Sequence, residues 1–260
     1  MTAAAKTRLA NVAEWLAAAE RITVLTGAGI STDSGIPDYR GPNGVWTRNP
    51  EAQRMSTIQD YVADPEVRKR AWQSRKVHPA WNAEPNDAHR ALAGLEKTGK
   101  LTALVTQNID ELHQRAGSSR EKVIELHGTI WWAECLTCGV RSPMADELAR
   151  VSDDEPDPSC ALCGGILKSA TISFGQQLDP AVLRAAWAAA QRCDLFLAMG
   201  TSLMVQPAAG LCDVAVEAGA RFVVVNAEPT PYDDIADTVL REPIGEILPA
   251  LVAAVVEERT

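Results

Sequence analysis

The sequence predicts an α/β fold in which a doubly wound, mostly parallel sheet carries a smaller inserted unit. Short apolar segments alternate with helical patterns along most of the 260 residues, as parallel strands joined by crossover helices do. A glycine-rich turn, Gly27-Ala28-Gly29, directly follows the first apolar segment. Between 130 and 167 the alternation stops, and four cysteines occur as two C-x-x-C pairs. We therefore expect a ligand-binding sheet interrupted by a metal-binding insertion.

The order of the elements follows from apolar spacing and from the positions of proline and glycine. Leu9, Val12 and Leu16 recur at helical spacing, which predicts an amphipathic helix over 7–20. Residues 31–55 are rich in Gly, Pro, Asn and Ser and are expected to form a long functional loop, whereas 56–98 are helical in pattern but broken by prolines. The expected strands are 22–25, 101–105, 122–126, 169–173, 194–199 and 221–225. Two further helices are expected over 180–192 and 244–258. Two more are expected to end near residues 116 and 218.

Composition and charge argue against several classes of protein. The hydrophobic fraction of 46% is sufficient for a large core, and no apolar run is long enough for a transmembrane helix. A net charge of −9 disfavours bulk nucleic-acid binding, which needs a basic surface. The N-terminus lacks the apolar segment of a secretory signal. We therefore expect a cytoplasmic monomer with neither a membrane nor a specific nucleic-acid partner.

The cysteines divide into a clustered set and two single residues. Cys193 and Cys212 lie in apolar patterns and are expected to be small core residues. The paired cysteines have the number and spacing of a closed tetrahedral zinc site with a structural role, one ion per chain. The alternative is a catalytic zinc, which would keep an open position and usually has a His or carboxylate ligand. A redox pair would need a C-x-x-C that opens a helix after a strand, and that context is absent. The expected ligands are Cys135, Cys138, Cys160 and Cys163.

Polar or glycine-rich residues follow four of the expected strands. They are Gly27, the pair Gln107-Asn108, the turn Gly200-Thr201-Ser202, and Asn226. Ligands of parallel sheets bind at the carboxyl ends of the strands, so these residues are expected to meet. The third glycine of the dinucleotide fingerprint is absent, however, and no acidic ribose partner follows about 20 residues later, so a hydride-transfer enzyme fits poorly.

His127 stands at the end of a strand, just before Gly128, near the same edge of the predicted sheet. A histidine in this position is often structural, but its place at a strand end shared with Gln107 and Asn108 favours a functional role. The residues His78, His89 and His113 are expected to be solvated on the surface.

The motifs then identify a family. GAGISTDSGIPDYRG, TQNIDELHQRAG, ELHG, the paired C-x-x-C, ISFG, GTSLMVQPA and VVNAEPT occur in the order found in sirtuins, which the chain resembles from about residue 20 to 250. The resemblance implies a Rossmann-like NAD-binding domain with a small domain of a zinc ribbon plus a helical insertion. The large domain would comprise 1–50, 86–129 and 168–260, with 31–50 as the cofactor-binding loop, and the small domain 51–85 and 130–167.

The same resemblance assigns roles to individual residues. His127 matches the general base and Asn108 a second catalytic residue. Asn108 and Asp110 can equally be N-cap residues of the following helix. Residues matching the acyl-lysine site are Ile172, Phe174 and Gly175. Residues matching cofactor contacts are Gly27, Ala28, Gly29, Ile30, Asp38, Tyr39, Arg40, Trp46, Gln107, Asn108, Ile109, Asp110, Gly200, Thr201, Ser202, Asn226, Glu228 and Ile244.

The implied activity is NAD-dependent deacylation of lysine in proteins or peptides. NAD is the co-substrate, the acyl group passes from lysine to ADP-ribose, and nicotinamide is released. His127 would take a proton from the ribose hydroxyls. Two alternatives use the same residues: a mono-ADP-ribosyltransferase, and a non-catalytic NAD-sensing zinc-ribbon module, which would need no base.

Four positions bear on the acyl preference. Tyr39 stands where the family often has Phe, and Gln176 where it often has Glu, which removes a charge near the peptide entrance. The subgroup that favours succinyl and malonyl lysine has a Tyr and an Arg three residues apart, where this chain has Trp72 and Arg75. We therefore expect a deacetylase, in which Arg75 still allows an anionic acyl group.

Overall fold

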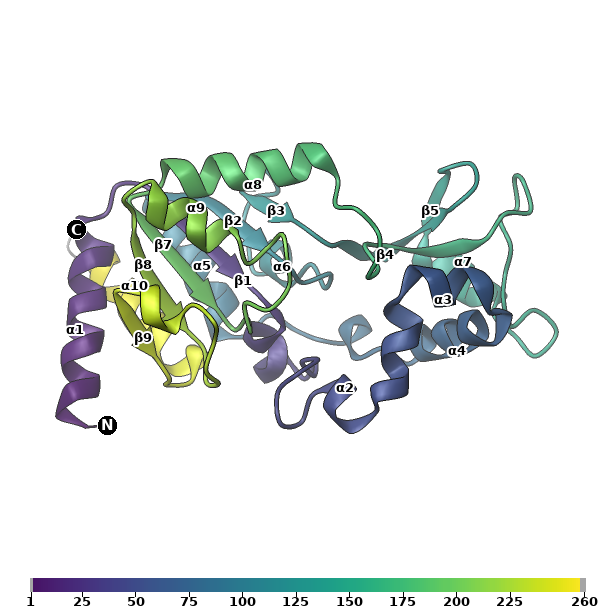
Figure 1. The fold of residues 1–260 in the computed structure, drawn as a ribbon, viewed down its shortest axis with the longest axis horizontal. Coiled ribbons are helices and arrows are strands. Elements are labelled where there is room, and N and C mark those ends of the chain that lie inside the picture. The colour runs from purple at the N-terminus through teal and green to yellow at the C-terminus, as the bar shows by residue number, and fades with distance from the viewer. Residues whose placement is uncertain (1, 258–260) are drawn as a thin grey trace.

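A six-stranded parallel sheet forms the centre of the larger part of the molecule, in the order β3-β2-β1-β7-β8-β9 (Figure 1). The computed structural model describes residues 2–257. The sheet confirms the predicted fold class, and its last strand, β9, is the one that the sequence did not predict. The strands are β1 Ile22–Thr26, β2 Leu101–Thr106, β3 Val123–Glu125, β7 Leu195–Met199, β8 Arg221–Val225 and β9 Thr238–Leu240.

Helices cover both faces of this sheet. Val24 belongs to an apolar cluster with α1, α5 and α10 on one face, whereas its neighbour Leu25 belongs to a cluster with α8 and α9 on the other. Because both faces are buried, the strands consist of continuous apolar residues rather than alternating ones. The helices are α1 Ala3–Ala18, α5 Asp87–Lys97, α8 Pro180–Arg192, α9 Leu211–Glu217 and α10 Ile244–Glu257.

The helix starts show why these segments are helical. The Thr2 hydroxyl accepts a hydrogen bond from the Ala5 N–H at 3.2 Å and begins α1 earlier than the expected residue 7. Asp179 caps α8 by accepting from the Ala181 N–H at 2.7 Å, with Pro180 in the first turn. Both caps satisfy N–H groups that a helix leaves unpaired.

The smaller part contains an antiparallel sheet in the order β5-β4-β6. The fully buried Trp72 packs with Met144 and Leu167 in its core. The strand expected near 169–173 is β6, so it belongs to this sheet and not to the parallel one. The cysteine segment also contains a helix, α7, whose seven residues are too few for a readable helical period. These elements are β4 Gly128–Cys135, β5 Arg141–Pro143, β6 Leu167–Thr171, α3 Ile58–Ala63, α4 Pro65–Lys76 and α7 Met144–Arg150.

The segment 31–55 is not the irregular loop that its composition suggested. Short helical turns occupy most of it, since proline and glycine punctuate such turns as readily as they punctuate loops. The helix expected after Gly200-Thr201-Ser202 begins only at Leu211. The short elements are η1 Ala28–Ser34, α2 Val45–Arg48, η2 Pro50–Ser56, η3 Pro79–Trp81, α6 Leu112–Arg115 and η4 Asp233–Ile235.

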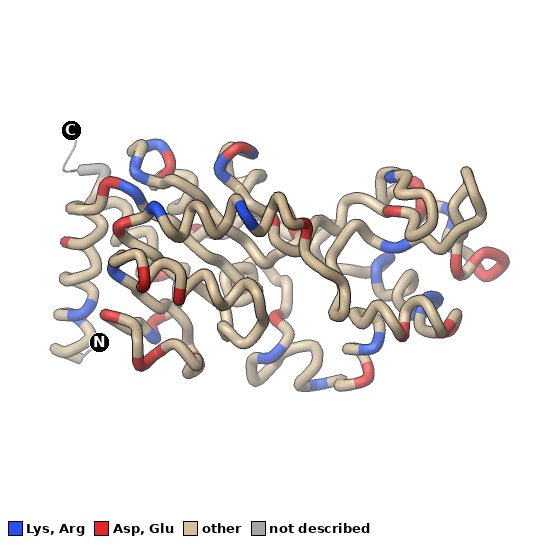
Figure 2. The backbone as a smooth tube through the Cα atoms, turned by 45° about the horizontal axis from the view of Figure 1, so that its top comes forward, with Lys and Arg blue, Asp and Glu red and all other residues tan. Residues whose placement is uncertain are grey.

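A small apolar cluster joins the two parts of the molecule. Ile36 and Leu112 pack with Ile130, and the rings of Trp81 and Trp131 meet edge to face with centroids 5.0 Å apart. Lys and Arg residues are interspersed with Asp and Glu along both parts in the described chain (Figure 2). Among residues 2–257, none of the helices combines the length and the hydropathy that crossing a membrane requires.

Candidate functional site

A cleft of about 1190 Å³ is lined by residues from both parts of the molecule. It lies at the carboxyl edge of the parallel sheet, where the sequence predicted a ligand. Most of the predicted site residues line it, but Ile30 and Asp110 lie beneath its surface and are buried. Those in the lining are Gly27, Ala28, Gly29, Asp38, Tyr39, Arg40, Trp46, Gln107, Asn108, Ile109, His127, Ile172, Phe174, Gly175, Gly200, Thr201, Ser202, Asn226, Glu228 and Ile244.

The strand order arranges these residues along the cleft. His127 follows β3, Asn108 follows β2, Gly27 follows β1, Gly200 follows β7 and Asn226 follows β8. Since neighbouring strands are about 4.8 Å apart, the edge runs about 19 Å from the histidine to the last asparagine. The site is therefore elongated, with the glycine turns at its middle.

The glycine turns after β1 and β7 touch backbone to backbone. The Gly29 N–H donates to the Gly200 carbonyl at 2.8 Å, and a Cβ on Gly29 would lie 2.8 Å from the Gly200 Cα. Gly200 has a φ of +60°, a conformation that side chains rarely adopt. The two turns can approach this closely only because neither residue has a side chain.

Replacing Gly29 by alanine is expected to weaken nucleotide binding by about tenfold or more, because overpacking forces the two turns apart at a typical cost of about 1–3 kcal/mol. Calorimetric titration with ADP-ribose measures the change. The matched variant Gly94→Ala tests the interpretation, because Gly94 lies within helix α5 and a Cβ there would meet only Val252, at an ordinary contact distance of 3.8 Å. Equal loss of binding in both variants would contradict the role given to the contact.

The His127 ring is held by one hydrogen bond. Its Nδ1 lies 3.0 Å from the Gln107 carbonyl oxygen, which can only accept, so Nδ1 carries the proton and donates. Burial lowers the pKa of His127 below its ordinary value of 6.5, although the hydrogen bond to Gln107 raises it in part. The ring is therefore neutral at pH 7, and its Nε2 lone pair is available as a base.

We expect kcat/KM to fall on acidification only below pH 6.5. Protonation of Nε2 abolishes the base, and the lowered pKa of His127 moves that protonation to more acid pH than in an ordinary histidine. A pH profile of kcat/KM measures this limb for the free enzyme. A limb centred above pH 7 would contradict the assignment.

Asn108 and Asp110 join one buried hydrogen-bond network. The Asn108 side-chain amide donates to the Gly27 carbonyl at 3.2 Å and to the Ser31 hydroxyl at 3.1 Å. The Ser31 hydroxyl donates in turn to Asp110 at 2.8 Å, and Asp110 also accepts from the Leu112 N–H at 3.0 Å. Burial raises the pKa of Asp110. Ser31 was not predicted as a site residue. The one feature of the sequence that could have indicated its role is its place just after the glycine turn.

The expectation that the other histidines are solvated was wrong for two of them. His89 and His113 are 0% and 1% exposed, and their rings lie 4.9 Å apart below the cleft. His113 Nε2 lies 3.0 Å from the Thr26 hydroxyl. Burial lowers the pKa of His89 to about 4 and that of His113 well below 6.5, so both are neutral. His78 is partly buried and lines the cleft.

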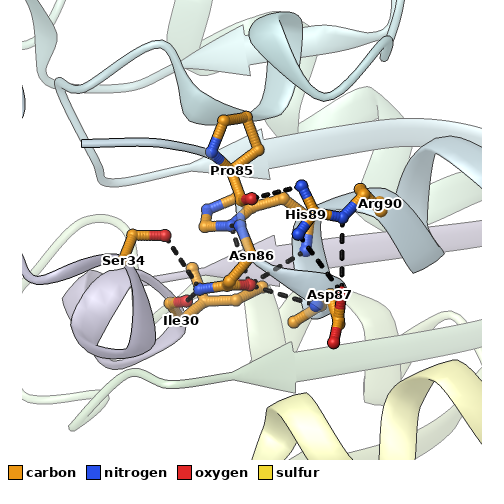
Figure 3. Close-up of polar contacts among 8 residues, drawn as sticks. Ile30, Ser34, Pro85, Asn86, Asp87, His89 and Arg90 are labelled. Carbon is orange, nitrogen blue, oxygen red and sulfur yellow. Dashed lines mark hydrogen bonds and ion pairs between the residues drawn. The ribbon is translucent and has the colours of Figure 1, made fainter. Parts of the chain in front are cut away.

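Asn86 explains the burial of His89 (Figure 3). It caps α5 in a reciprocal arrangement with His89, and its side-chain amide donates to the Ile30 carbonyl at 2.8 Å and to Ser34 at 3.1 Å. Helix α5 thus anchors the turn η1. The spacing Asn86-x-x-His89 is that of a capping box, and this signal could have identified the contact.

Aromatic side chains connect the predicted cofactor loop to the predicted acyl-lysine residues. Trp46 lies 4.6 Å from Tyr39 and 5.3 Å from Phe174, between ring centroids. The Arg40 guanidinium lies 4.6 Å above the Trp46 ring. Since Phe174 follows β6, these contacts join the predicted cofactor loop to the small sheet.

A polar group on the small sheet lies opposite this loop. Arg75 donates to the Ser169 hydroxyl at 3.1 Å, and Ser169 lies 2.8 Å from the Thr171 hydroxyl. All three residues line the cleft. Arg75 Nη1 is buried without a hydrogen-bond partner among residues 2–257, as is Trp72 Nε1. The sequence reasoning missed Ser169 and Thr171.

The four clustered cysteines converge at one end of the small sheet. Their Sγ atoms all lie within 4.8 Å of one another, and none forms a disulfide. A tetrahedral zinc ion with four thiolates, at about 2.3 Å from each, fits this arrangement. Cys135 and Cys160 are buried whereas Cys138 and Cys163 are exposed, so the site closes the edge of the small core. The cluster is consistent with a structural ion.

Comparison with known proteins gives the same family for most of the chain. The model of the Sir2 family matches residues 27–207. The chain is 59% identical over 230 residues to NAD-dependent protein deacetylase 2 of Streptomyces coelicolor, covering 88% of this chain and 95% of that protein. It is 45% identical over 240 residues to NAD-dependent protein deacetylase 1 of Bradyrhizobium diazoefficiens, covering 92% of each.

Solved structures agree with this match. A Sir2 homolog in complex with NAD has a TM-score of 0.85 and 35% identity, over 96% of this chain and 95% of that chain. A Sir2 structure with a deacetylated p53 peptide and 3′-O-acetyl ADP-ribose has a TM-score of 0.86 and 36% identity, over 96% and 98% of the two chains.

Proposed function

The chain belongs to the Sir2 family, and we propose that it is an NAD-dependent protein lysine deacylase whose reaction takes place between the glycine turns and His127. The observation that carries this function is the neutral His127, with Nδ1 bound to Gln107 and Nε2 free, in the same cleft as the Gly29–Gly200 contact. A binding module needs the glycine turns but not the base.

NAD fits the cleft as the co-substrate, and it supplies a ribosyl C1′ that becomes electrophilic as nicotinamide leaves. His127 takes a proton from a ribose hydroxyl through Nε2 while the Gln107 carbonyl stabilises the charge that forms on the ring. Both hydrogens of the Asn108 side-chain amide are donated to the turn after β1, so its side-chain oxygen is available to accept a hydrogen bond from the ligand. Trp46 and Tyr39 exclude water from the centre of the cleft.

The decisive experiment supplies NAD with acetyl-, succinyl- and long-acyl-lysine peptides and follows O-acyl-ADP-ribose by mass. We expect an acyl-ADP-ribose product, free lysine peptide and nicotinamide in equal amounts. Stable transfer of ADP-ribose to protein without loss of the acyl group would identify an ADP-ribosyltransferase instead. Binding of NAD without any product would identify an NAD-sensing module. The expected partners are acyl-lysine proteins or peptides, and the proposed state is a monomer.

The acyl preference is expected to depend on Arg75. Acetyl-lysine is the proposed main substrate, and the charge of Arg75 beside Ser169 supports a secondary activity on succinyl-lysine. Replacing Arg75 by glutamine is expected to lower kcat/KM for the succinyl peptide by about tenfold, because a charge-assisted contact is lost, while the acetyl peptide changes by less than about threefold. The exposed neighbour variant Lys76→Gln controls for the loss of a nearby charge. Equal effects on both peptides would contradict the prediction.

A further inference from the structure

The segment that leads from the helical insertion into α5 is fixed to the larger part of the molecule. Arg115 of α6 donates to the Ala83 carbonyl at 2.7 Å, and Arg90 of α5 donates to the Pro85 carbonyl. Asn86 follows directly and joins this segment to the turn η1 (Figure 3). Asn86 therefore begins α5 from a backbone position that its neighbours already hold.

The two polar atoms of the Asn86 side chain have separate partners. Its Oδ1 caps α5 by accepting from the N–H groups of Ala88 at 3.0 Å and His89 at 3.3 Å. Its Nδ2 donates to the Ile30 carbonyl at 2.8 Å and to the Ser34 hydroxyl at 3.1 Å, both in η1. The cap needs only an acceptor, whereas the anchor of η1 needs two donated hydrogens. Substitution can therefore remove the anchor and keep the cap.

The anchored carbonyl lies next to a buried residue of the site. The Ile30 carbonyl belongs to the peptide group that precedes Ser31, so the hydrogen bond from Asn86 fixes the backbone at Ser31. The Ser31 hydroxyl accepts from the Asn108 side-chain amide at 3.1 Å and donates to Asp110 at 2.8 Å. Ser31 and Asn108 are 1% and 8% exposed, so water does not replace these partners readily. The anchor thus reaches Asn108 through one intervening residue.

Asn108 offers its side-chain oxygen to the ligand only while its amide nitrogen is turned toward the turn after β1. Two hydrogen bonds hold the nitrogen there, one to the Gly27 carbonyl and one to the Ser31 hydroxyl. A shift of Ser31 removes the second bond and allows the amide to rotate. A nitrogen facing the ligand would donate and could not accept from a ribose hydroxyl.

We propose that Asn86 is a positioning residue for deacylation, which acts through η1 and Ser31 to keep the Asn108 side-chain oxygen turned toward the ligand. This inference rests on the proposed function. Asn86 itself does not line the cleft, so its effect on the reaction is indirect.

The test compares Asn86→Ser and Asn86→Asp with the unmodified full chain, using NAD and an acetyl-lysine peptide. Asn, Asp and Ser are about equally good caps, so the helix start is kept in both variants. In Asn86→Ser both amide donations are lost, and kcat is expected to fall about tenfold. In Asn86→Asp a carboxylate also faces the Ile30 carbonyl, and kcat is expected to fall about thirtyfold. The measured quantity is O-acetyl-ADP-ribose by mass under saturating substrates.

Binding separates a positioning role from a general loss of structure. Calorimetric affinity for ADP-ribose and KM for the peptide are expected to change by less than about threefold in both variants, because the Gly29–Gly200 contact and Phe174 do not contact Asn86. Ser34→Ala removes one of the two acceptors and is expected to lower kcat by about threefold. It keeps the test decisive if an Asn86 variant does not fold.

Ser119→Ala is the matched control for lost stability. It removes the hydrogen bond from the Ser119 hydroxyl to Glu96 near the other end of α5, away from η1. We expect a similar change in thermal unfolding and a kcat within about twofold of the unmodified protein.

An unchanged kcat in folded Asn86→Ser would overturn the inference while NAD-dependent deacylation stands, as would an equal fall of kcat in Ser119→Ala. A rise in KM for NAD with kcat unchanged would also overturn it, since the anchor would then serve binding and not the orientation of Asn108. Absence of product with the unmodified protein would overturn the proposed function and the inference together.

Discussion

Replacing His127 by alanine is expected to lower kcat for deacylation by about a hundredfold to ten-thousandfold, which is the usual contribution of a positioned general base. Binding of ADP-ribose should change by less than about threefold, because the ring donates only to the Gln107 carbonyl and the glycine turns remain intact. Single-turnover mass measurement of O-acyl-ADP-ribose gives the rate, and calorimetry gives the affinity.

The variant His127→Asn separates the base from its structural contact. Asparagine retains an N–H that can donate to the Gln107 carbonyl, but it has no basic nitrogen in place of Nε2. If the base is the function, this variant is as slow as His127→Ala. Recovery of most of the rate in His127→Asn would show instead that the histidine only holds the strand end.

Loss of the zinc site is the second large effect. Replacing Cys138 by serine is expected to reduce zinc from about one ion per chain to near zero and to abolish deacylation. Structural zinc in small folds contributes about 10 kcal/mol or more of folding free energy, and the small sheet has only a minor apolar core to replace it. Strand β6 leads directly from this sheet to Phe174, so its disorder removes one wall of the cleft.

Metal analysis after gel filtration, together with thermal unfolding, checks this prediction. Cys193→Ala serves as the control because Cys193 is buried against α8, outside the cluster. It should keep its full zinc content. Zinc-free Cys138→Ser with full activity would show that the ion has no part in forming the cleft.

The sequence was most informative where its signal depended on strand ends. Gly27, Asn108, Gly200 and Asn226 each follow an apolar strand, and parallel pairing brings such ends together regardless of the loops between them. The course of the loops was harder to predict. Helix α7 has seven residues and β9 has three, which are too short for a periodic pattern.

Buried polar groups were the other source of error. His89 and His113 have the sequence context of surface residues, but in the structure the cap by Asn86 and the hydroxyls of Ser31 and Thr26 supply polar partners for the buried rings. Ser169 and Thr171 of β6 were also missed, because Arg75, which donates to the Ser169 hydroxyl, lies on α4, far away in the sequence. Such partners are distant in sequence, so single-sequence patterns do not reveal them.

The central position of β1 also has a consequence for how the chain acquires its structure. This strand is made first, yet its partners β2 and β7 begin at Leu101 and Leu195. Strands so far apart in sequence can pair only after a long loop has closed. The conformational entropy of the loop is lost before the strand contacts stabilise the pair, and this slows folding. During synthesis the apolar residues of β1 therefore lack their strand partners until most of the polypeptide has left the ribosome. We therefore expect nascent chains that stop before β7 to bind chaperones and to remain sensitive to protease.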